Sequence, residues 1–220
     1  MTSSDAREGA VPASRELEFW RGEFGDAYLD RNQPREEQVR ARVRLWSQIL
    51  DRTVGAPPRE IVEVGANLGL NLRALRQLTA ARLIAIEPNA RARERLSEDQ
   101  VVRREDIHDG AGQAMPLGDA SADLVFTCGV LIHVHPDDLL TVCREIHRTS
   151  RRYIACIEYF SVRLEEVHYR GQDGLLFKRD FGGFYLDHFP DLRIVDYGFA
   201  WRRATGLDDL NWWLFEKGSG

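Results

Sequence analysis

The sequence of 220 residues contains only three cysteines, and none of them belongs to a C-x-x-C pair. This odd number argues against a disulfide framework and fits a reducing compartment, with Cys128, Cys143 and Cys156 as small core residues. No apolar run approaches the roughly 20 residues that a membrane span requires. The opening segment MTSSDAREGA also lacks the basic and apolar regions of a signal peptide. We therefore expect a cytoplasmic protein without a membrane partner.

A surplus of positive charge is also missing. The 30 basic and 35 acidic side chains leave a net charge of -5, so no overall field attracts nucleic acid, which argues against an RNA or DNA substrate. Internal repeats and the low-complexity linkers of a scaffold are absent as well. His133 and His135 stand near Asp137 and Asp138, but nothing else has ligand spacing and the two acids suit the start of a helix. We therefore expect no metal.

One stretch, IVEVGANLGLN at residues 61–71, organises the rest of the chain. Its apolar first half, interrupted by Glu63, predicts a buried strand that runs directly into a glycine turn. A leucine every three or four residues from 68 to 78 then predicts a helix. In such a βα unit Gly65 permits the sharp turn, Gly69 allows close approach of the backbone, and the helix N-terminus offers free N–H groups to a polar ligand. The stretch therefore predicts a nucleotide-binding site.

The glycine spacing discriminates between nucleotides. A dinucleotide-binding turn needs glycine at its first, third and sixth positions, and counting from Gly65 the last two positions hold Asn67 and Leu70. Asn67 is compatible with the turn, because asparagine tolerates left-handed backbone better than most residues. About 20 residues further on, Glu87 ends a second apolar segment. A carboxylate at this position accepts hydrogen bonds from ribose hydroxyls. The alternative role for Glu87 is that of an acid at the start of the next helix. An NAD-dependent oxidoreductase stays open as an alternative that this spacing disfavours.

Apolar segments alternate with helical patterns along the rest of the chain. Further strands are predicted within 81–89, ending at Glu87, at 101–107, at 124–134 together with an exit loop, and at 151–160. An antiparallel pair follows at 192–201 and 210–217. A short helix, ended by Pro190, precedes this pair. Strands that alternate with helices form a mostly parallel sheet, so we expect the α/β class. We divide the chain into a disordered tail at 1–14, an N-terminal helical cap at 15–57 and a domain at 58–220.

These elements carry motifs that resemble class I S-adenosylmethionine (SAM) methyltransferases. The motifs are E-x-G-x-N-x-G at 63–69, MPL at 115–117, ASADLVF at 120–126 and Leu-Ile-His at 131–133. The resemblance implies a Rossmann-like seven-stranded class I methyltransferase sheet, SAM as the cofactor, and SAM-dependent methyl transfer as the activity. Four longer strings, EFWRGEFGDAYLDRN, GVLIHVHP, IEYF and HYRGQDGLLFKRDFG, resemble the narrower family of methylases associated with pseudaminic acid biosynthesis.

The resemblance also implies which residues contact the cofactor. Glu63 would lie near its methionine end, Glu87 on the ribose, and the loop from Ala111 to Met115 along the adenine. The aromatic segment from Trp20 to Asn32 is either a helix laid over the core or a lid over the cofactor, and we expect the lid. The full set of expected cofactor residues is Tyr28, Arg31, Asn32, Glu63, Gly65, Asn67, Gly69, Glu87, Pro88, Ala111, Gly112, Met115, Cys128 and Gly129.

The acceptor site is expected at the carboxyl end of the fifth strand and in the insert at 160–181. The alternative interpretation of this insert is a solvated charged loop. A general base is needed only when the acceptor atom is protonated at neutral pH, and the candidates are His133, Glu158 and His168. Expected substrate residues are Tyr159, Tyr169, Arg170, Lys178 and Arg179.

Because the acceptor region contains charges of both signs, we expect a small polar metabolite as substrate. It would be a sugar acid or an amino-acid-like natural-product precursor, methylated on oxygen or nitrogen. A non-catalytic SAM-binding partner protein is the alternative from another class. The sequence leaves the oligomeric state open.

Overall fold

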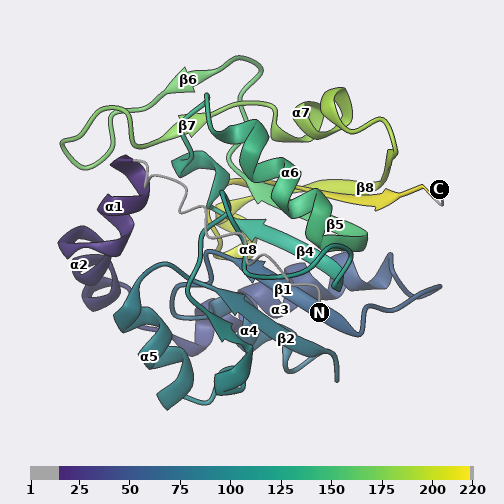
Figure 1. The fold of residues 1–220 in the computed structure, drawn as a ribbon, viewed down its shortest axis with the longest axis horizontal. Coiled ribbons are helices and arrows are strands. Elements are labelled where there is room, and N and C mark those ends of the chain that lie inside the picture. The colour runs from purple at the N-terminus through teal and green to yellow at the C-terminus, as the bar shows by residue number, and fades with distance from the viewer. Residues whose placement is uncertain (1–14, 219–220) are drawn as a thin grey trace, which may run out of the picture.

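Five strands pair in parallel at the centre of the structure, in the order β3, β2, β1, β4, β5 (Figure 1). The computed structural model describes residues 15–218, so the tail expected at 1–14 lies outside the described residues. The parallel strands are β1 (Glu60–Val64), β2 (Arg82–Ile86), β3 (Ile107–His108), β4 (Ala122–Cys128) and β5 (Ser150–Glu158). β9 (Leu210–Lys217) pairs antiparallel with β5, and β8 (Leu192–Ala200) pairs with β9 at the edge. The expected seven-stranded, mostly parallel sheet is confirmed.

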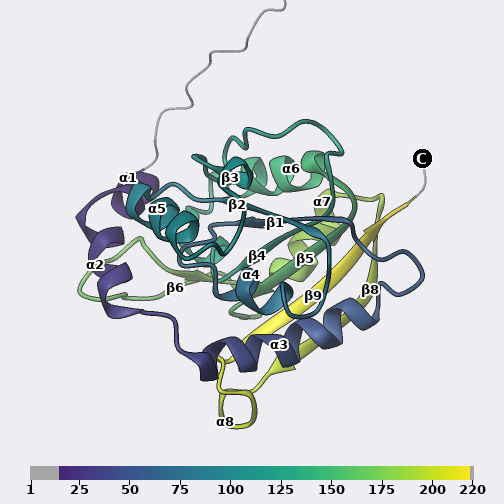
Figure 2. The same ribbon diagram turned by 90° about the horizontal axis from the view of Figure 1, so that it is seen from below.

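Helices cover both faces of this sheet. α3 (Glu36–Asp51), α4 (Leu70–Leu75) and α5 (Ala90–Glu98) pack on one face, and α6 (Leu139–Thr149) and α7 (Phe181–His188) pack on the other. Figure 2 shows α3 and α6 on opposite sides of the strands. The central strands are therefore buried on both faces, which explains their nearly continuous apolar sequences. Within residues 15–218 no helix is long and apolar enough to cross a membrane.

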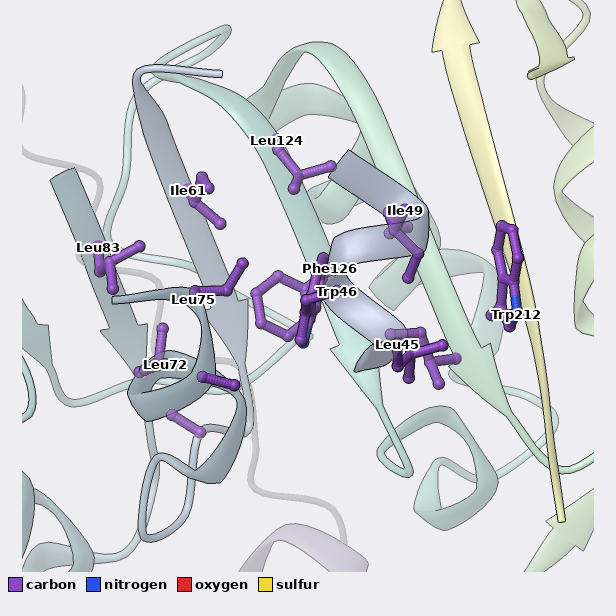
Figure 3. Packing of buried hydrophobic residues seen from close by; sticks show 14 of the residues in the cluster. Leu45, Trp46, Ile49, Ile61, Leu72, Leu75, Leu83, Leu124, Phe126 and Trp212 are labelled. Atoms are coloured by element: carbon purple, nitrogen blue, oxygen red, sulfur yellow. The ribbon is translucent and has the colours of Figure 1, made fainter. Parts of the chain in front are cut away.

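The core on the α3 side is built around Trp46 (Figure 3). Its side chain is fully buried, and its ring lies edge to face against Phe126 of β4, with the ring centroids 4.4 Å apart. The amphipathic period of α3 places Leu45 and Ile49 beside Trp46, toward the sheet. The indole N–H of Trp46 donates to Asn71 of α4 at 3.3 Å. One side chain thus packs the core and joins two helices.

Two elements differ from the sequence expectation. The segment 101–107 was expected to be a strand, but only Ile107 belongs to β3. The buried carboxylate of Asp106 accepts hydrogen bonds from Arg82 and Arg103, and a 3-10 turn, η1 (Arg104–Asp106), bends the chain so that it can do so. The helix expected from the leucines at 68–78 is the shorter α4.

Two short helices and a hairpin lie together beyond the carboxyl ends of the parallel strands. α1 (Arg15–Arg21) and α2 (Glu23–Arg31) come from the N-terminal segment (Figure 1). The insert after β5 forms the hairpin of β6 (Glu165–Glu166) and β7 (Phe177–Lys178). The rings of Phe24 in α2 and Tyr169 in the hairpin have centroids 6.4 Å apart. Segments far apart in sequence therefore cover the same end of the sheet.

We expect the substitution Trp46→Ala to lower the free energy of unfolding by about 3–5 kcal/mol, because it leaves a large cavity in the core. Trp46→Phe keeps most of the packing and should cost less. Urea denaturation of the purified variants measures both changes. Val54→Ala is the matched control, since Val54 is 75% exposed and its change should stay within about 0.5 kcal/mol. Equal effects of Trp46→Ala and the control would contradict the central role of Trp46.

Candidate active site

The turn after β1 contains three residues with left-handed backbone. Gly65, Asn67 and Gly69 have φ angles of 73°, 49° and 69°. A Cβ on Gly65 would come within 2.7 Å of Val130 in the loop after β4, so glycine allows these two loops to meet. Asn67 stands at the centre of the turn, in a conformation that asparagine tolerates. The turn therefore keeps its shape without a central glycine.

Glu87 follows β2 and is buried beside this turn. One carboxylate oxygen accepts from the N–H of Asn67 at 2.7 Å, and the other accepts from the N–H of Asn89 at 2.8 Å. Burial raises the pKa of Glu87 to about 7, and the two N–H donors oppose this rise. A carboxylate oxygen has more than one acceptor position. Both oxygens can therefore still accept a hydrogen bond from a ligand.

Glu63 of β1 and Arg42 of α3 face the same space with incomplete hydrogen bonding. Asn71 donates to one oxygen of Glu63 at 2.7 Å, while the buried second oxygen has no partner among the described residues. The Nε of Arg42 is buried and unpartnered too, although a terminal nitrogen donates to the carbonyl of Gln38 at 3.1 Å. Burial raises the pKa of Glu63 to about 8. These incompletely bonded groups provide binding positions for a ligand that carries charges of both signs.

These side chains line a cavity of about 300 Å³ at the carboxyl ends of β1, β2 and β4. The cavity brings together most of the residues that the sequence suggested for the cofactor. The expected cofactor residues in its lining are Tyr28, Asn32, Glu63, Gly65, Asn67, Glu87, Pro88, Ala111, Gly112, Cys128 and Gly129.

Three expected cofactor residues lie outside the cavity lining. A Cβ on Gly69 would meet two side chains of α5 and the loop after it at 2.6 and 2.8 Å, so its close approach is to the core. The N–H of Met115 donates to Glu145 at 3.0 Å, and the guanidinium of Arg31 lies 5.7 Å from the ring centroid of Phe24. These three residues therefore pack or bind next to other side chains and do not face the cavity.

His133, at the end of the 3-10 turn η2 (Leu131–His133), is the candidate base that lines the cavity. Its Nδ1 lies 2.6 Å from the carbonyl oxygen of Leu175 in the hairpin. A carbonyl only accepts, so Nδ1 carries the proton and Nε2 keeps its lone pair. Burial lowers the pKa of His133 to about 4, so the ring is neutral at neutral pH. His168, by contrast, is exposed on the hairpin and lies 2.7 Å from Asp173.

Glu158 ends β5 and lies behind the cavity wall. The side chain is fully buried, and one oxygen accepts from the N–H groups of Val130 and Leu131, each at 3.1 Å. Burial raises the pKa of Glu158 to about 7, and these donors oppose the rise. Val130 also packs against Gly65. The carboxylate therefore holds the loop after β4, which packs against the glycine turn and carries His133. η2 folds over the carboxylate and separates it from the cavity.

None of the expected substrate residues lines the cavity, and each contacts another side chain. Three are cations over aromatic rings: Arg170 lies 5.5 Å from the ring centroid of Tyr169, Lys178 5.4 Å from that of Tyr159, and Arg179 4.3 Å from that of Phe184. The hydroxyl of Tyr159 donates to Asp208 at 3.1 Å. Asp208 itself lines the cavity, whereas none of these three cations does.

Sequence reasoning missed several polar residues of the cavity lining, namely Gln38, Arg42, Asn71 and Asp208. Arg42 carried a weak signal, because it lies one helical turn before Trp46 on the partly buried side of α3. Asp208 carried none, since it belongs to a polar turn before β9 that resembles any surface loop.

Asn89 docks the N-terminal helices onto the site. Its side-chain NH₂ donates to the carbonyl of Trp20 at 3.2 Å and to Asp26 at 2.9 Å, while its oxygen caps α5. Its backbone N–H also binds Glu87. Trp20 and Tyr28 consequently form part of the cavity wall.

Comparison with known proteins identifies this architecture. Residues 62–153 match the family model described as a methyltransferase domain. No curated protein sequence matches the chain. The structure is similar to 1,6-didemethyltoxoflavin-N1-methyltransferase of Burkholderia thailandensis, solved with bound 1,6-didemethyltoxoflavin and S-adenosylhomocysteine. The sequence identity is 21% and the TM-score 0.69, over 96% of this chain and 94% of that chain.

Two further solved structures share the fold. A protein of Haloferax volcanii, in complex with the Trm112 methyltransferase activator, has 13% identity and a TM-score of 0.67, over 89% of this chain and 96% of that chain. The [4+2]-cyclase SpnF has 15% identity and a TM-score of 0.60, over 81% of each chain. At such identities these structures show the fold alone. The matched methyltransferase domain, in a chain with this fold, indicates a SAM-dependent methyltransferase, an enzyme whose cofactor is SAM.

The docking of α1 and α2 predicts that they are required for cofactor binding. A chain that begins at residue 33 lacks Trp20 and Tyr28 and should bind S-adenosylhomocysteine at least about tenfold more weakly, because part of the cavity wall is gone. A chain that begins at residue 15 should bind as the full chain does. Isothermal titration calorimetry measures the three affinities. Undiminished binding by the chain from residue 33 would show that the two helices are not a lid.

Proposed function

We propose that the protein transfers the methyl group of SAM to an oxygen or nitrogen atom of a small polar metabolite. The observation that carries this proposal is a single cavity that joins Glu63, Glu87 and the glycine turn to His133. A site with the chemistry of a nucleoside and amino-acid binding pocket thus shares one space with a neutral imidazole whose Nε2 can accept a proton.

The cavity residues fit SAM group by group. Glu87 is assigned to the ribose hydroxyls, since both of its oxygens can accept further hydrogen bonds. Arg42 and Glu63 are assigned to the carboxylate and the ammonium of the methionine end, because each has a buried polar atom without a partner in the described part of the chain. Gly112 is assigned to the adenine. When bound, SAM supplies a methyl group that its sulfonium already activates.

His133 is assigned as the general base. The carbonyl of Leu175 holds the ring with Nδ1 protonated, so Nε2 is the atom that takes a proton from an acceptor hydroxyl or amine. Trp20 and Tyr28 exclude water from this end of the cavity. Glu158 is assigned to positioning, through the loop that it holds. A non-catalytic SAM-binding protein would not need an imidazole oriented in this way.

The cavity lining favours an amino-acid-like acceptor over a sugar acid. Asp208 lines the cavity, whereas Arg170 and Lys178, which would bind an acidic sugar, are placed over aromatic rings outside the lining. The Burkholderia enzyme is named for methylating a nitrogen of a small molecule, which supports a small-molecule acceptor here. The resemblance to methylases associated with pseudaminic acid biosynthesis rests on the sequence strings alone.

The assignment of Arg42 to the methionine end predicts that its substitution lowers the affinity for some ligands and not for others. Arg42→Met should weaken S-adenosylhomocysteine binding about tenfold to a hundredfold, the value of one charged hydrogen bond. The affinity for 5′-methylthioadenosine, which lacks the amino-acid end, should not change. Calorimetry measures both ligands, with Arg40→Met as the control, since Arg40 is exposed on the same helix and pairs with Glu36. Equal weakening of both ligands would remove Arg42 from the methionine end.

The assignment of His133 predicts a defect in turnover alone. His133→Gln should slow methylation of the physiological acceptor about 10²- to 10⁴-fold, because the proton acceptor is lost. Binding of S-adenosylhomocysteine should stay unchanged. Release of S-adenosylhomocysteine from SAM measures turnover, and His135→Gln is the control, since His135 is 44% exposed and lies near Asp137. Full turnover by His133→Gln would refute the base assignment.

A further inference from the structure

The side of the cavity next to His133 is built by residues from separate segments, and we call it the acceptor end. Trp20 comes from α1, Tyr28 from α2, His133 from η2, and Asp208 from the turn between α8 (Arg202–Thr205) and β9. Trp20, His133 and Asp208 have no assigned contact with the cofactor. Their chemistry therefore reports on the second substrate.

The polar atoms of the acceptor end are mainly hydrogen-bond acceptors. Nε2 of His133 has a lone pair and no hydrogen-bond partner within residues 15–218. The carboxylate of Asp208 receives one hydrogen bond, from the hydroxyl of Tyr159 at 3.1 Å, and has further acceptor positions. The hydroxyl of Tyr28 can donate or accept. Such a set binds a ligand that offers N–H or O–H donors.

Burial raises the pKa of Tyr28, and two cations, Arg170 and Arg42, act on this side chain in the opposite direction. Arg170 and Lys178 are held over the rings of Tyr169 and Tyr159, outside the cavity lining. Arg42 lines the cavity, but it belongs to the methionine end through its proximity to Glu63. At the acceptor end Asp208 thus contributes an exposed carboxylate to the cavity lining, whereas Arg170 and Lys178 do not line the cavity.

Aromatic rings complete the acceptor end. The ring centroids of Trp20 and His133 are 4.9 Å apart, those of Trp20 and Tyr28 are 5.4 Å apart, and those of His133 and Tyr169 are 5.4 Å apart. Ring faces attract cations and flat ring systems. A carboxylate beside such rings is a combination that suits a nitrogen compound better than a sugar hydroxyl.

We propose that the methyl acceptor is an amine or an N–H heterocycle, and that Asp208 selects it by pairing with its N–H groups. This inference rests on the proposed methyl transfer and narrows it to nitrogen. The acceptor nitrogen, in its uncharged form, attacks the methyl carbon, so a C–N bond forms while the C–S bond breaks. The electron pair of that bond stays on sulfur, and the proton lost from nitrogen passes to Nε2 of His133. The products are the N-methyl compound and S-adenosylhomocysteine.

Matched probes test the selection directly. The protein loaded with S-adenosylhomocysteine is titrated by calorimetry with 2-phenylethylamine, 2-phenylethanol and 3-phenylpropanoate, which share a phenyl group and differ in the polar end. Benzimidazole represents the N–H heterocycles. The amine or the heterocycle should bind at least about tenfold more tightly than the alcohol and the carboxylate. Whichever of these two probes binds more tightly shows whether the acceptor is an amine or an N–H heterocycle.

Asp208→Asn tests the residue, because it removes the charge and keeps an oxygen that accepts from Tyr159. It should weaken the preferred nitrogen probe about tenfold to a hundredfold and leave S-adenosylhomocysteine binding unchanged. Asp209→Asn is the control, since Asp209 accepts from the N–H of Arg202 and does not line the cavity.

The inference is overturned if the alcohol or the carboxylate binds as well as the nitrogen probes, if no nitrogen probe binds, or if Asp208→Asn has no effect. Those outcomes, with S-adenosylhomocysteine binding intact, leave the proposed methyl transfer standing. A protein that does not bind S-adenosylhomocysteine at all would instead contradict the proposed function itself.

Discussion

Three carboxylates buried at the carboxyl ends of parallel strands hold the site together. Glu63, Glu87 and Glu158 are almost inaccessible to solvent, and burial raises their pKa values to about 8, about 7 and about 7. A buried carboxylate is costly unless hydrogen bonds compensate. Here the loops supply most of them, through backbone N–H groups and one side-chain amide. The loops fold around these carboxylates. As a result, the turn after β1, the start of α5 and η2 meet at one cavity.

The compensation is incomplete at Glu63 and at Glu158, each of which has one buried oxygen without a hydrogen-bond partner among the described residues. One oxygen of Glu63 and the Nε of Arg42 have no partner in the described chain. Because the folded protein holds a proton on Glu63 that the unfolded chain releases above pH 4.5, this group costs stability as the pH rises from about 4.5 to about 8. A bound ammonium group would lower the pKa of Glu63 and remove that cost. On the proposed assignment of Glu63 to the methionine end, fold stability and cofactor affinity are therefore linked at this residue.

The two ends of the cavity have different origins. The proposed cofactor end is built mainly by the strand ends and the turns that follow them. The acceptor end is built by α1, α2, η2 and the turn before β9, while the hairpin orients His133. Such connecting segments vary without disturbing the sheet. A protein named as a [4+2]-cyclase shares the fold, so the fold by itself does not determine the chemistry.

The sequence by itself determined the α/β class and the place of the glycine turn and Glu87, because apolar periodicity and glycine spacing are local signals. It also indicated His133, through its position after the fourth strand. Only the tertiary structure decided that Asp208, 75 residues further along the chain, lies at the same cavity as His133. It also decided that Glu158 supports a loop from behind instead of facing a substrate, since η2 covers its carboxylate. Side chains that meet across long stretches of chain leave no local pattern, because packing alone brings them together.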